Sequence, residues 1–306
     1  MERCAPMRIL VSGSRGFVGT RLIPRLEAAG HRVTGFDVDS VDVSDASMVR
    51  GVVKKATPDA VVHLAAVAFV PDATRDPDLA HRVNVQGTQN VIEALERDAP
   101  EARLLLVGSS EQYAAVEPGA PALTEVAPLA PQGAYAETKA AAERLGLEAA
   151  GRGLDVVMIR AFNHTGPGQA PLFVAPDFAR QIALIEAGNP PIMRVGNLDS
   201  VRDFLHVDDV VDAYLRLLDR AVPADTYNIA SGVGTRIGHL LESLAGLAGV
   251  TPEIERDEKR WRPADARVGD SERLKRATGW QPSRPLEGLL TELLAYWRRQ
   301  IQEQSP

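Results

Sequence analysis

Tyr135 and Lys139 lie four residues apart, and on a helix this spacing places both side chains on the same face. A free phenol has a pKa of about 10, so it is a poor acid–base catalyst at neutral pH. A neighbouring ammonium group favours the phenolate, and we therefore expect Lys139 to lower the pKa of Tyr135. The pair predicts a site that transfers a proton.

Ser109 and Ser110 precede Glu111 directly after the hydrophobic segment 103–107, which we expect to be a strand. Ligands bind at the carboxyl edge of the strands in open α/β sheets. A hydroxyl group at that edge can hydrogen-bond to a substrate carbonyl or to the tyrosine oxygen. One of the two serines can equally cap a helix or a turn, so both interpretations remain open.

Three glycines, Gly13, Gly16 and Gly19, lie at the junction of an expected strand at 8–12 and an expected helix at 17–29. Glycines at this spacing permit a tight turn and let backbone N–H groups approach a pyrophosphate. The helix N-terminus adds a partial positive charge at the same place. The segment therefore predicts the phosphate-binding turn of a dinucleotide site.

Asp37 ends the second expected strand, at 31–36, where a carboxylate can accept hydrogen bonds from the adenosine ribose of NAD(H) or NADP(H). Asp37 would repel the 2′-phosphate of NADP(H), whereas Arg15 in the glycine turn can pair with that phosphate. The preference between the two cofactors therefore remains open. Asp42 and Val43 are placed to meet the adenine, although Asp42 is equally suited to a simple turn.

Short β-branched segments alternate with longer amphipathic segments in the first half of the chain. The expected strands are 8–12, 31–36, 60–64, 103–107 and 155–160. The expected helices are 17–29, 46–56, 78–97 and 134–150. This alternation is typical of βαβ units, so we expect an α/β fold with a doubly wound, parallel Rossmann-type sheet.

The pattern changes after residue 162. Segment 163–176 is rich in glycine and proline and is expected to be a loop, and 258–270 is a polar, arginine-rich loop. Helices are expected at 177–187, 207–219, 235–248 and 284–302, with a strand at 227–230. We interpret 7–165 as the NAD(P)-binding domain and 166–303 mainly as a smaller, interleaved substrate-binding lobe, from which some segments return to the first domain.

Composition excludes several classes of protein. The 306 residues carry a net charge of −7, which argues against a broad basic surface for nucleic acids. The single cysteine, Cys4, cannot form an intramolecular disulfide and fits a reducing compartment. No apolar segment is long enough for a membrane helix, and the histidines do not have a metal-ligand spacing. We expect a soluble cytoplasmic protein with no membrane, nucleic-acid or metal partner.

Taken together, these segments resemble the extended short-chain dehydrogenase/reductase family over essentially the whole chain. The segments that carry the resemblance are 13–19, 63–66, 84–88, 109–113, 135–139, 202–204, 206–209 and 227–232. Members of this branch act mostly on nucleotide-activated sugars, and two of their long helices often pair across a homodimer. The resemblance therefore implies a nucleotide-diphosphate sugar as substrate and a homodimer as the assembly.

A closer resemblance is to the reductases that convert GDP-4-keto-6-deoxy-mannose to GDP-rhamnose. The segments that carry it are 160–169, 173–182, 195–198, 262–265 and 269–270, and GDP-mannose 4,6-dehydratases share part of this pattern. It implies reduction of the C4 ketone by NAD(P)H with a tyrosine as proton donor. A 4,6-dehydratase or 4-epimerase using bound NAD(P), and a regulator that only senses NAD(P), remain the alternatives.

The resemblance and the glycine turn together predict the site residues. The expected catalytic residues are Ser109, Tyr135 and Lys139. The expected cofactor-binding residues are Gly13, Arg15, Gly16, Phe17, Val18, Gly19, Asp37, Asp42, Val43, Leu64, Ala65, Ala66, Asn84, Tyr135, Lys139 and Phe162. The expected substrate-binding residues are Ser110, Glu111, Asn163, Val174, Arg180, Arg202 and Arg262.

Two of these predictions leave alternatives open. Arg202 and Arg262 match positions that hold a nucleotide diphosphate, and two arginines on separate loops can clamp one, although either can equally be a surface charge. Glu111 matches a catalytic glutamate of the dehydratases, but the reductases also have a glutamate there, so Glu111 does not decide the reaction. Many family members have Tyr-Gly after the segment that corresponds to 109–111, whereas this chain has Tyr113 followed by alanine.

Overall fold

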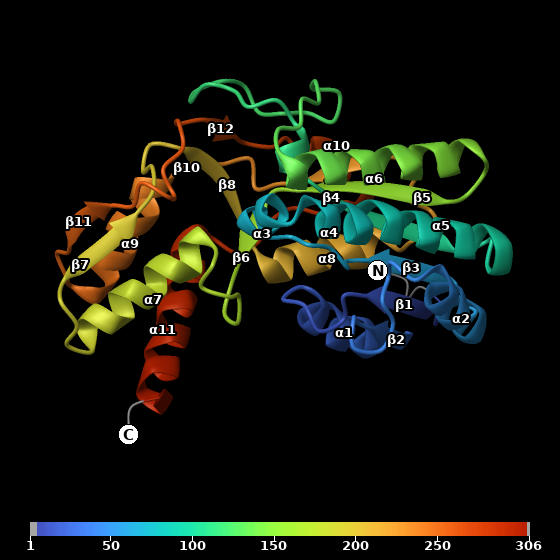
Figure 1. Cartoon of the computed structure of the whole chain (residues 1–306), viewed down its shortest axis with the longest axis horizontal. Coiled ribbons are helices and arrows are strands. Elements are labelled where there is room, and N and C mark those ends of the chain that lie inside the picture. Colours follow the sequence, from blue (N-terminus) through green and yellow to red (C-terminus); the bar gives the residue numbers. More distant parts are fainter. Residues whose placement is uncertain (1–4, 305–306) are drawn as a thin grey trace.

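A six-stranded parallel sheet forms the centre of the computed structural model, which describes residues 5–304 (Figure 1). Cys4 lies outside the described residues. The strand order is β2 (Arg32–Phe36), β1 (Arg8–Ser12), β3 (Ala60–His63), β4 (Arg103–Ser109), β5 (Val156–Ala161) and β9 (Thr226–Ile229). All five neighbouring pairs are parallel. The predicted doubly wound Rossmann-type sheet is confirmed.

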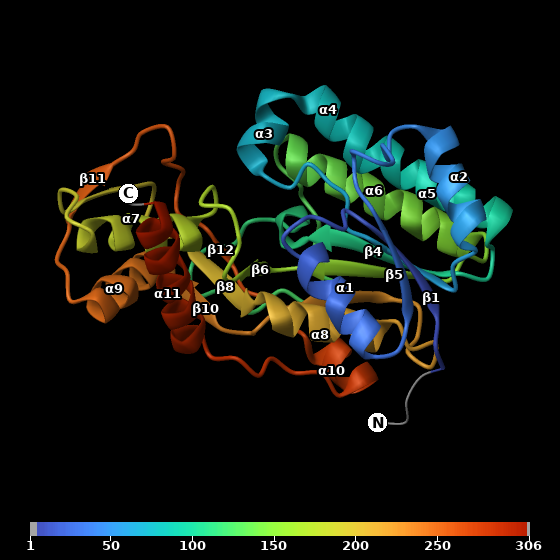
Figure 2. The same ribbon diagram turned by 90° about the horizontal axis from the view of Figure 1, so that it is seen from below.

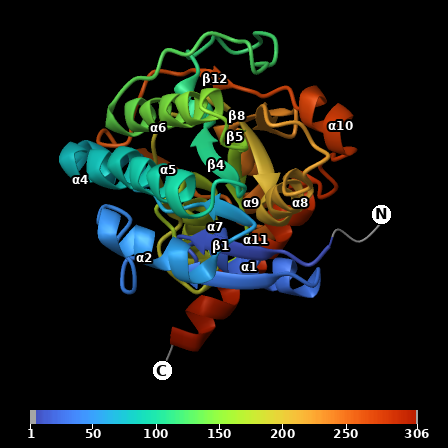
Figure 3. The same ribbon diagram turned by 90° about the vertical axis from the view of Figure 1, so that its right-hand side faces the viewer.

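Helices cover both faces of this sheet (Figure 3). One face carries α1 (Gly19–Ala28), α8 (Val207–Leu217) and α10 (Glu272–Thr278), and the other carries α2 (Ala46–Ala56), α5 (Gly87–Asp98) and α6 (Ala134–Gly151). Successive strand residues point to opposite faces, so Ile9 and Val11 pack in the first core and Leu10 packs in the second. Strands buried on both faces explain the nearly continuous apolar segments of the sequence.

The long helix expected at 78–97 is divided in the structure. Its elements are α4 (Pro77–His81), a π-helical turn η1 (Arg82–Gln86) and α5, and a further helix, α3 (Val70–Arg75), precedes them. Asp76 caps α4 by accepting a hydrogen bond from the backbone of Leu79, with Pro77 at the first helical position. Single π-helical turns are frequent at functional sites. Here the turn buries Asn84.

The prediction of a structureless segment at 163–176 is wrong at both of its ends. It contains the short strand β6 (Asn163–Thr165), and α7 (Val174–Glu186) begins before its end. β6 pairs with β8 (Val201–His206), which lies between β10 (Gly234–Arg236) and β12 (Ala266–Arg267). A separate pair joins β7 (Ile192–Val195) to β11 (Glu253–Arg256). Strands this short contain too few residues to show a hydrophobic period in the sequence.

Three helices from the second half of the chain form a lobe beside the sheet (Figure 2). α7, α9 (Ile237–Ala248) and α11 (Leu286–Gln304) enclose a core that is separate from the two cores of the sheet. Asp203 in β8 is fully buried and accepts hydrogen bonds from the backbone N–H groups of Ser231, Gly232 and Gly269. This carboxylate fastens the small sheet of the lobe to the chain that follows β9. No helix within residues 5–304 is long and apolar enough to cross a membrane.

Candidate active site

A cavity of about 720 Å³ opens at the carboxyl edge of the central sheet. The ends of parallel strands converge there, so residues far apart in the sequence share one wall. Its volume lies within the range of about 300–1,000 Å³ typical of small-molecule sites. The predicted residues that line it are Gly13, Arg15, Gly16, Phe17, Val18, Gly19, Asp37, Asp42, Val43, Leu64, Ala65, Ala66, Ser109, Ser110, Glu111, Tyr135, Lys139, Phe162 and Asn163.

The glycine turn leaves no room for a side chain at Gly13 or at Gly19. Gly13 has a φ of 68°, and a Cβ atom there would lie 2.8 Å from the amide nitrogen of Ala65. A Cβ atom on Gly19 would clash with the carbonyl oxygen of Gly13. Backbone amides and the N-terminus of α1 therefore line a close-fitting turn in the cavity wall, and this arrangement fits the pyrophosphate of a dinucleotide.

Asp37 braces the glycine turn. Its carboxylate accepts hydrogen bonds from the backbone N–H groups of Arg15, at 3.0 Å, and Val38, at 2.9 Å. The guanidinium of Arg15 forms an exposed ion pair with Asp39 at 2.5 Å. A positive and a negative side chain thus both lie at this end of the cavity, and the preference for NAD(H) or NADP(H) remains open.

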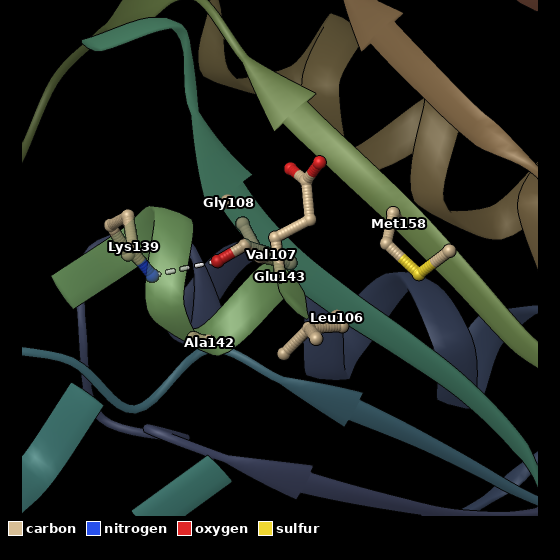
Figure 4. Close-up of a pocket in the computed structure, with 7 residues that line it drawn as sticks. All are labelled: Leu106, Val107, Gly108, Lys139, Ala142, Glu143 and Met158. Carbon is tan, nitrogen blue, oxygen red and sulfur yellow. Dashed lines mark hydrogen bonds between the residues drawn. The ribbon is translucent and has the colours of Figure 1, made fainter. Parts of the chain in front are cut away.

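The three predicted catalytic residues converge on the end of β4. Ser109 is the last residue of β4, and its side chain lies close enough to that of Tyr135 to lower the pKa of the phenol. Tyr135 and Lys139 extend from the first turns of α6, which begins after Gly133 with its φ of 83°. The ammonium group of Lys139 donates a hydrogen bond to the carbonyl oxygen of Val107 at 2.7 Å (Figure 4). α6 is thereby fixed against β4 at the level of the serine.

Burial determines the protonation of this group. The prediction that Lys139 lowers the pKa of Tyr135 is wrong for this structure. Desolvation raises the pKa of Tyr135 to about 12 and outweighs the hydrogen bond with Ser109, while the Glu111 charge raises it further. Desolvation also lowers the pKa of Lys139 to about 8. At neutral pH Tyr135 is therefore a protonated phenol, beside a lysine that is mostly charged.

His63 supports the loop that follows β3. Its Nδ1 lies 2.7 Å from the hydroxyl of Ser12 and its Nε2 lies 3.2 Å from that of Thr88. The Ser12 hydroxyl accepts hydrogen bonds from the backbone N–H groups of Leu64 and Ala65. Burial, and to a lesser extent the Lys139 charge, lowers the pKa of His63 to about 3. A neutral, internally bonded imidazole therefore shapes the predicted cofactor loop.

Asn84 does not line the cavity, although we expected it to bind the cofactor. Its Oδ1 accepts a hydrogen bond from the backbone of Val67 at 2.8 Å, and its Nδ2 donates one to Thr138 at 3.0 Å. Only 2% of Asn84 is exposed, because the π-helical turn directs it behind the wall. Through these hydrogen bonds, Asn84 connects the segment that follows β3 to helix α6.

Four predicted substrate residues also lie away from this cavity wall: Val174, Arg180, Arg202 and Arg262. Arg202 forms an ion pair with Asp265 at 2.7 Å, and Arg262 donates to the carbonyl oxygen of Trp261 at 2.6 Å. The sequence shows which residues are arginines, but it does not show which carboxylates pair with them. Substrate binding by these four residues remains a prediction.

The structure adds residues that the sequence analysis missed. Gln169 and Tyr214 line the cavity, and the Gln169 Oε1 and the Tyr214 hydroxyl are buried without a hydrogen-bond partner among the described residues. Tyr214 resembles an ordinary core position of α8 in the sequence. Gln112 accepts a hydrogen bond from the backbone N–H of Ser109, and the Ser-x-x-Gln spacing of a capping box could have indicated it.

The model of the NAD dependent epimerase/dehydratase family matches residues 9–230. The chain belongs to this family. Membership in the epimerase/dehydratase family confirms the predicted NAD(P)-dependent oxidoreductase of the extended short-chain dehydrogenase/reductase type.

Individual relatives are similar to this chain over most of its length. It is 36% identical to GDP-6-deoxy-D-mannose reductase of Pseudomonas aeruginosa, over 97% of this chain and 99% of the relative. It is 31% identical to GDP-6-deoxy-D-talose 4-dehydrogenase of Aggregatibacter actinomycetemcomitans, over 89% and 92%. A solved structure, RMD from Pseudomonas aeruginosa complexed with NADPH, matches with a TM-score of 0.88 and 36% identity over 96% of this chain and 99% of that one.

Replacement of Gly19 by alanine should weaken dinucleotide binding. The added Cβ clashes with the backbone of Gly13, so the turn must open and its amides move away from the phosphates. We expect the Kd for NADPH, measured by calorimetry, to rise about tenfold or more, which corresponds to ~1.4 kcal/mol. Gly51→Ala is the matched control because a Cβ there meets nothing within 4 Å. Equal affinity in both variants would contradict this role.

Reductase activity should decline as the pH rises through about 8. Desolvation lowers the pKa of Lys139 to about 8, so its charge is present below that pH and lost above it, whereas Tyr135 keeps its proton. The pH profile of kcat/KM reports the groups of the free enzyme. Any activity retained by Lys139→Arg should lack this decline. A wild-type profile of kcat/KM that stays flat beyond pH 9 would refute the need for a charged Lys139.

Proposed function

We propose that the protein uses NAD(P)H to reduce the C4 ketone of GDP-4-keto-6-deoxy-mannose to GDP-rhamnose. The observation that carries this proposal is that Ser109, Tyr135 and Lys139 line the same cavity as the glycine turn. End-to-end similarity to a GDP-6-deoxy-D-mannose reductase supports the choice of substrate.

Each residue of the site has a defined task in this reaction. The glycine turn and the loop 64–66 hold the dinucleotide, which supplies a hydride when bound. Ser109 hydrogen-bonds to the carbonyl oxygen of the sugar and aligns it with Tyr135. Tyr135 gives its proton to the oxygen as negative charge develops there. Lys139 stabilises that charge and holds a ribose hydroxyl of the cofactor. General acid catalysis of this kind contributes roughly 10²–10⁴-fold to the rate.

The protonated phenol of Tyr135 is the state in which a reductase begins its reaction. A dehydratase or an epimerase begins by oxidising the sugar, so its tyrosine must first accept a proton. A reductase begins with a tyrosine that carries the proton. Desolvation raises the pKa of Tyr135 to about 12, so the phenol carries its proton at neutral pH. The chain is also similar to a GDP-6-deoxy-D-talose 4-dehydrogenase. A product with the other configuration at C4 is therefore the second candidate.

The substrate lies in this proposal between the sheet edge and the lobe. Ser110, Glu111 and Asn163 line the cavity beyond the catalytic residues and contact the sugar. We propose that 7–165 forms the cofactor domain and 166–303 mainly an interleaved lobe, and that the nucleotide of the substrate lies against this lobe. Its candidate contacts are Val174, Arg180, Arg202 and Arg262.

The proposal is tested by supplying GDP-, dTDP- and UDP-linked 4-keto-6-deoxy sugars with NADH or NADPH. We expect one equivalent of NAD(P)H, followed by its absorbance, to be consumed per sugar, fastest with the GDP-linked one. Tyr135→Phe should lower kcat by roughly 10²–10⁴-fold while leaving NADPH binding largely intact. Conversion of GDP-mannose, which carries a C4 hydroxyl, without net consumption of NAD(P)H would indicate a dehydratase or an epimerase instead.

We further propose that the enzyme acts in the cytoplasm as a homodimer. α6 exposes Leu147, with 47% of its surface accessible, and apolar side chains on this helix can pack against a second copy. Sedimentation of the purified chain at twice its mass of 32.9 kDa would support the dimer. Sedimentation as a monomer at micromolar concentration would refute it.

A further inference from the structure

A buried polar network lies directly behind the proposed catalytic serine. Gln112 is at its centre and is fully buried. Its Oε1 accepts a hydrogen bond from the backbone N–H of Ser109 at 2.8 Å, and its Nε2 donates one to Glu143 at 2.6 Å. We infer that Gln112 is a positioning residue that fixes Ser109 relative to Tyr135, an inference that rests on the proposed function.

The network connects the serine to the helix that carries the other catalytic residues. Glu143 lies four residues after Lys139 on α6, and Figure 4 shows both side chains beside the end of β4. Lys139 bonds to the carbonyl oxygen of Val107, and Glu143 reaches the N–H of Ser109 through Gln112. Two independent links, two residues apart on β4, therefore set the distance between β4 and α6.

Glu143 cannot move away from Gln112 because an arginine holds it. Arg160 of β5 binds both carboxylate oxygens, with its Nε at 3.0 Å from one and a terminal nitrogen at 2.5 Å from the other. The remaining terminal nitrogen donates to the hydroxyl of Tyr113 at 2.9 Å, and that hydroxyl donates to Asn228 at 2.6 Å. Buried, fully paired networks of this kind rigidify the groups that they connect.

The backbone beside Gln112 is shaped to accept its carboxamide. A Cβ atom on Gly108 would clash with the Gln112 Oε1 and would lie 2.8 Å from the carbonyl oxygen of Ile159. A glycine directly before Ser109 therefore makes room for the side chain that holds Ser109. The Ser109 hydroxyl accepts a hydrogen bond from the backbone of Glu111 at 3.2 Å, which completes the capping box.

The chemical step is sensitive to this arrangement. A displacement of about 1 Å in a reacting group can cost about 10²-fold in rate. Without Gln112, the buried N–H of Ser109 loses its acceptor and the serine can move away from Tyr135. Cofactor binding depends mainly on the glycine turn, which lies on a different strand, and Lys139 keeps its own hydrogen bond to Val107.

The test replaces Gln112 by methionine, which has similar volume but forms no comparable hydrogen bonds. We expect kcat for NADPH oxidation with the sugar nucleotide to fall about tenfold or more, and KM for NADPH to stay within about twofold of the wild-type value. The deuterium isotope effect on kcat should increase, because hydride transfer becomes rate-limiting. A loss of folded enzyme lowers kcat without changing the isotope effect, so an unchanged isotope effect would overturn the inference.

Tyr113→Phe is the matched control because it removes the hydroxyl at the far end of the same network. It should lower the melting temperature while kcat stays within about twofold of the wild type. In a double-mutant cycle, Gln112→Met should have little further effect on kcat in a Ser109→Ala background, since Gln112 acts through Ser109. Additive losses would contradict the inference.

Hydrogen exchange separates this inference from the proposed function. A wild-type chain that oxidises no NADPH with any 4-keto sugar nucleotide would contradict the proposed function alone. Exchange of the Ser109 amide should be faster in Gln112→Met than in the wild type, whatever the substrate. An unchanged exchange rate would overturn the assignment of Gln112.

Discussion

The site depends on the position of α6 along the end of β4. Lys139 donates to the carbonyl oxygen of Val107, and the buried ion pair between Glu143 and Arg160 joins α6 to β5. Breaking a buried ion pair leaves an uncompensated charge, which costs about 3–5 kcal/mol. Sliding α6 along the sheet would break both contacts at once. The helix therefore has one stable register, and in that register Tyr135 meets Ser109.

The same register determines the electrostatics of the site. α6 buries Lys139 and partly buries Tyr135 at the edge of the sheet. Desolvation favours the neutral form of both groups, so it raises the pKa of Tyr135 and lowers that of Lys139. The phenol keeps its proton at neutral pH, while the lysine is close to losing one. The glycine turn approaches the same edge of the sheet, so the cavity places a dinucleotide beside a protonated tyrosine. A reduction begins from a tyrosine in this protonated state.

The sequence predicted what depends on local spacing. The alternating strands have a spacing that can be counted in the sequence, and the predicted sheet is confirmed. The glycines before α1 and the pair Tyr135 and Lys139 line one cavity. The pKa of Tyr135 was predicted in the wrong direction, because burial depends on how distant elements pack. Strand β8 and the pairing of Arg202 with Asp265 were missed for the same reason.

The central claim is that a hydride is delivered to C4 of a GDP-linked sugar. The most direct measurement uses NADPH deuterated at the transferred position and locates the deuterium in the product by NMR and mass spectrometry. The account predicts one deuterium at C4 of GDP-rhamnose for each NADPH oxidised. A product without deuterium, or with deuterium at another carbon, would contradict it.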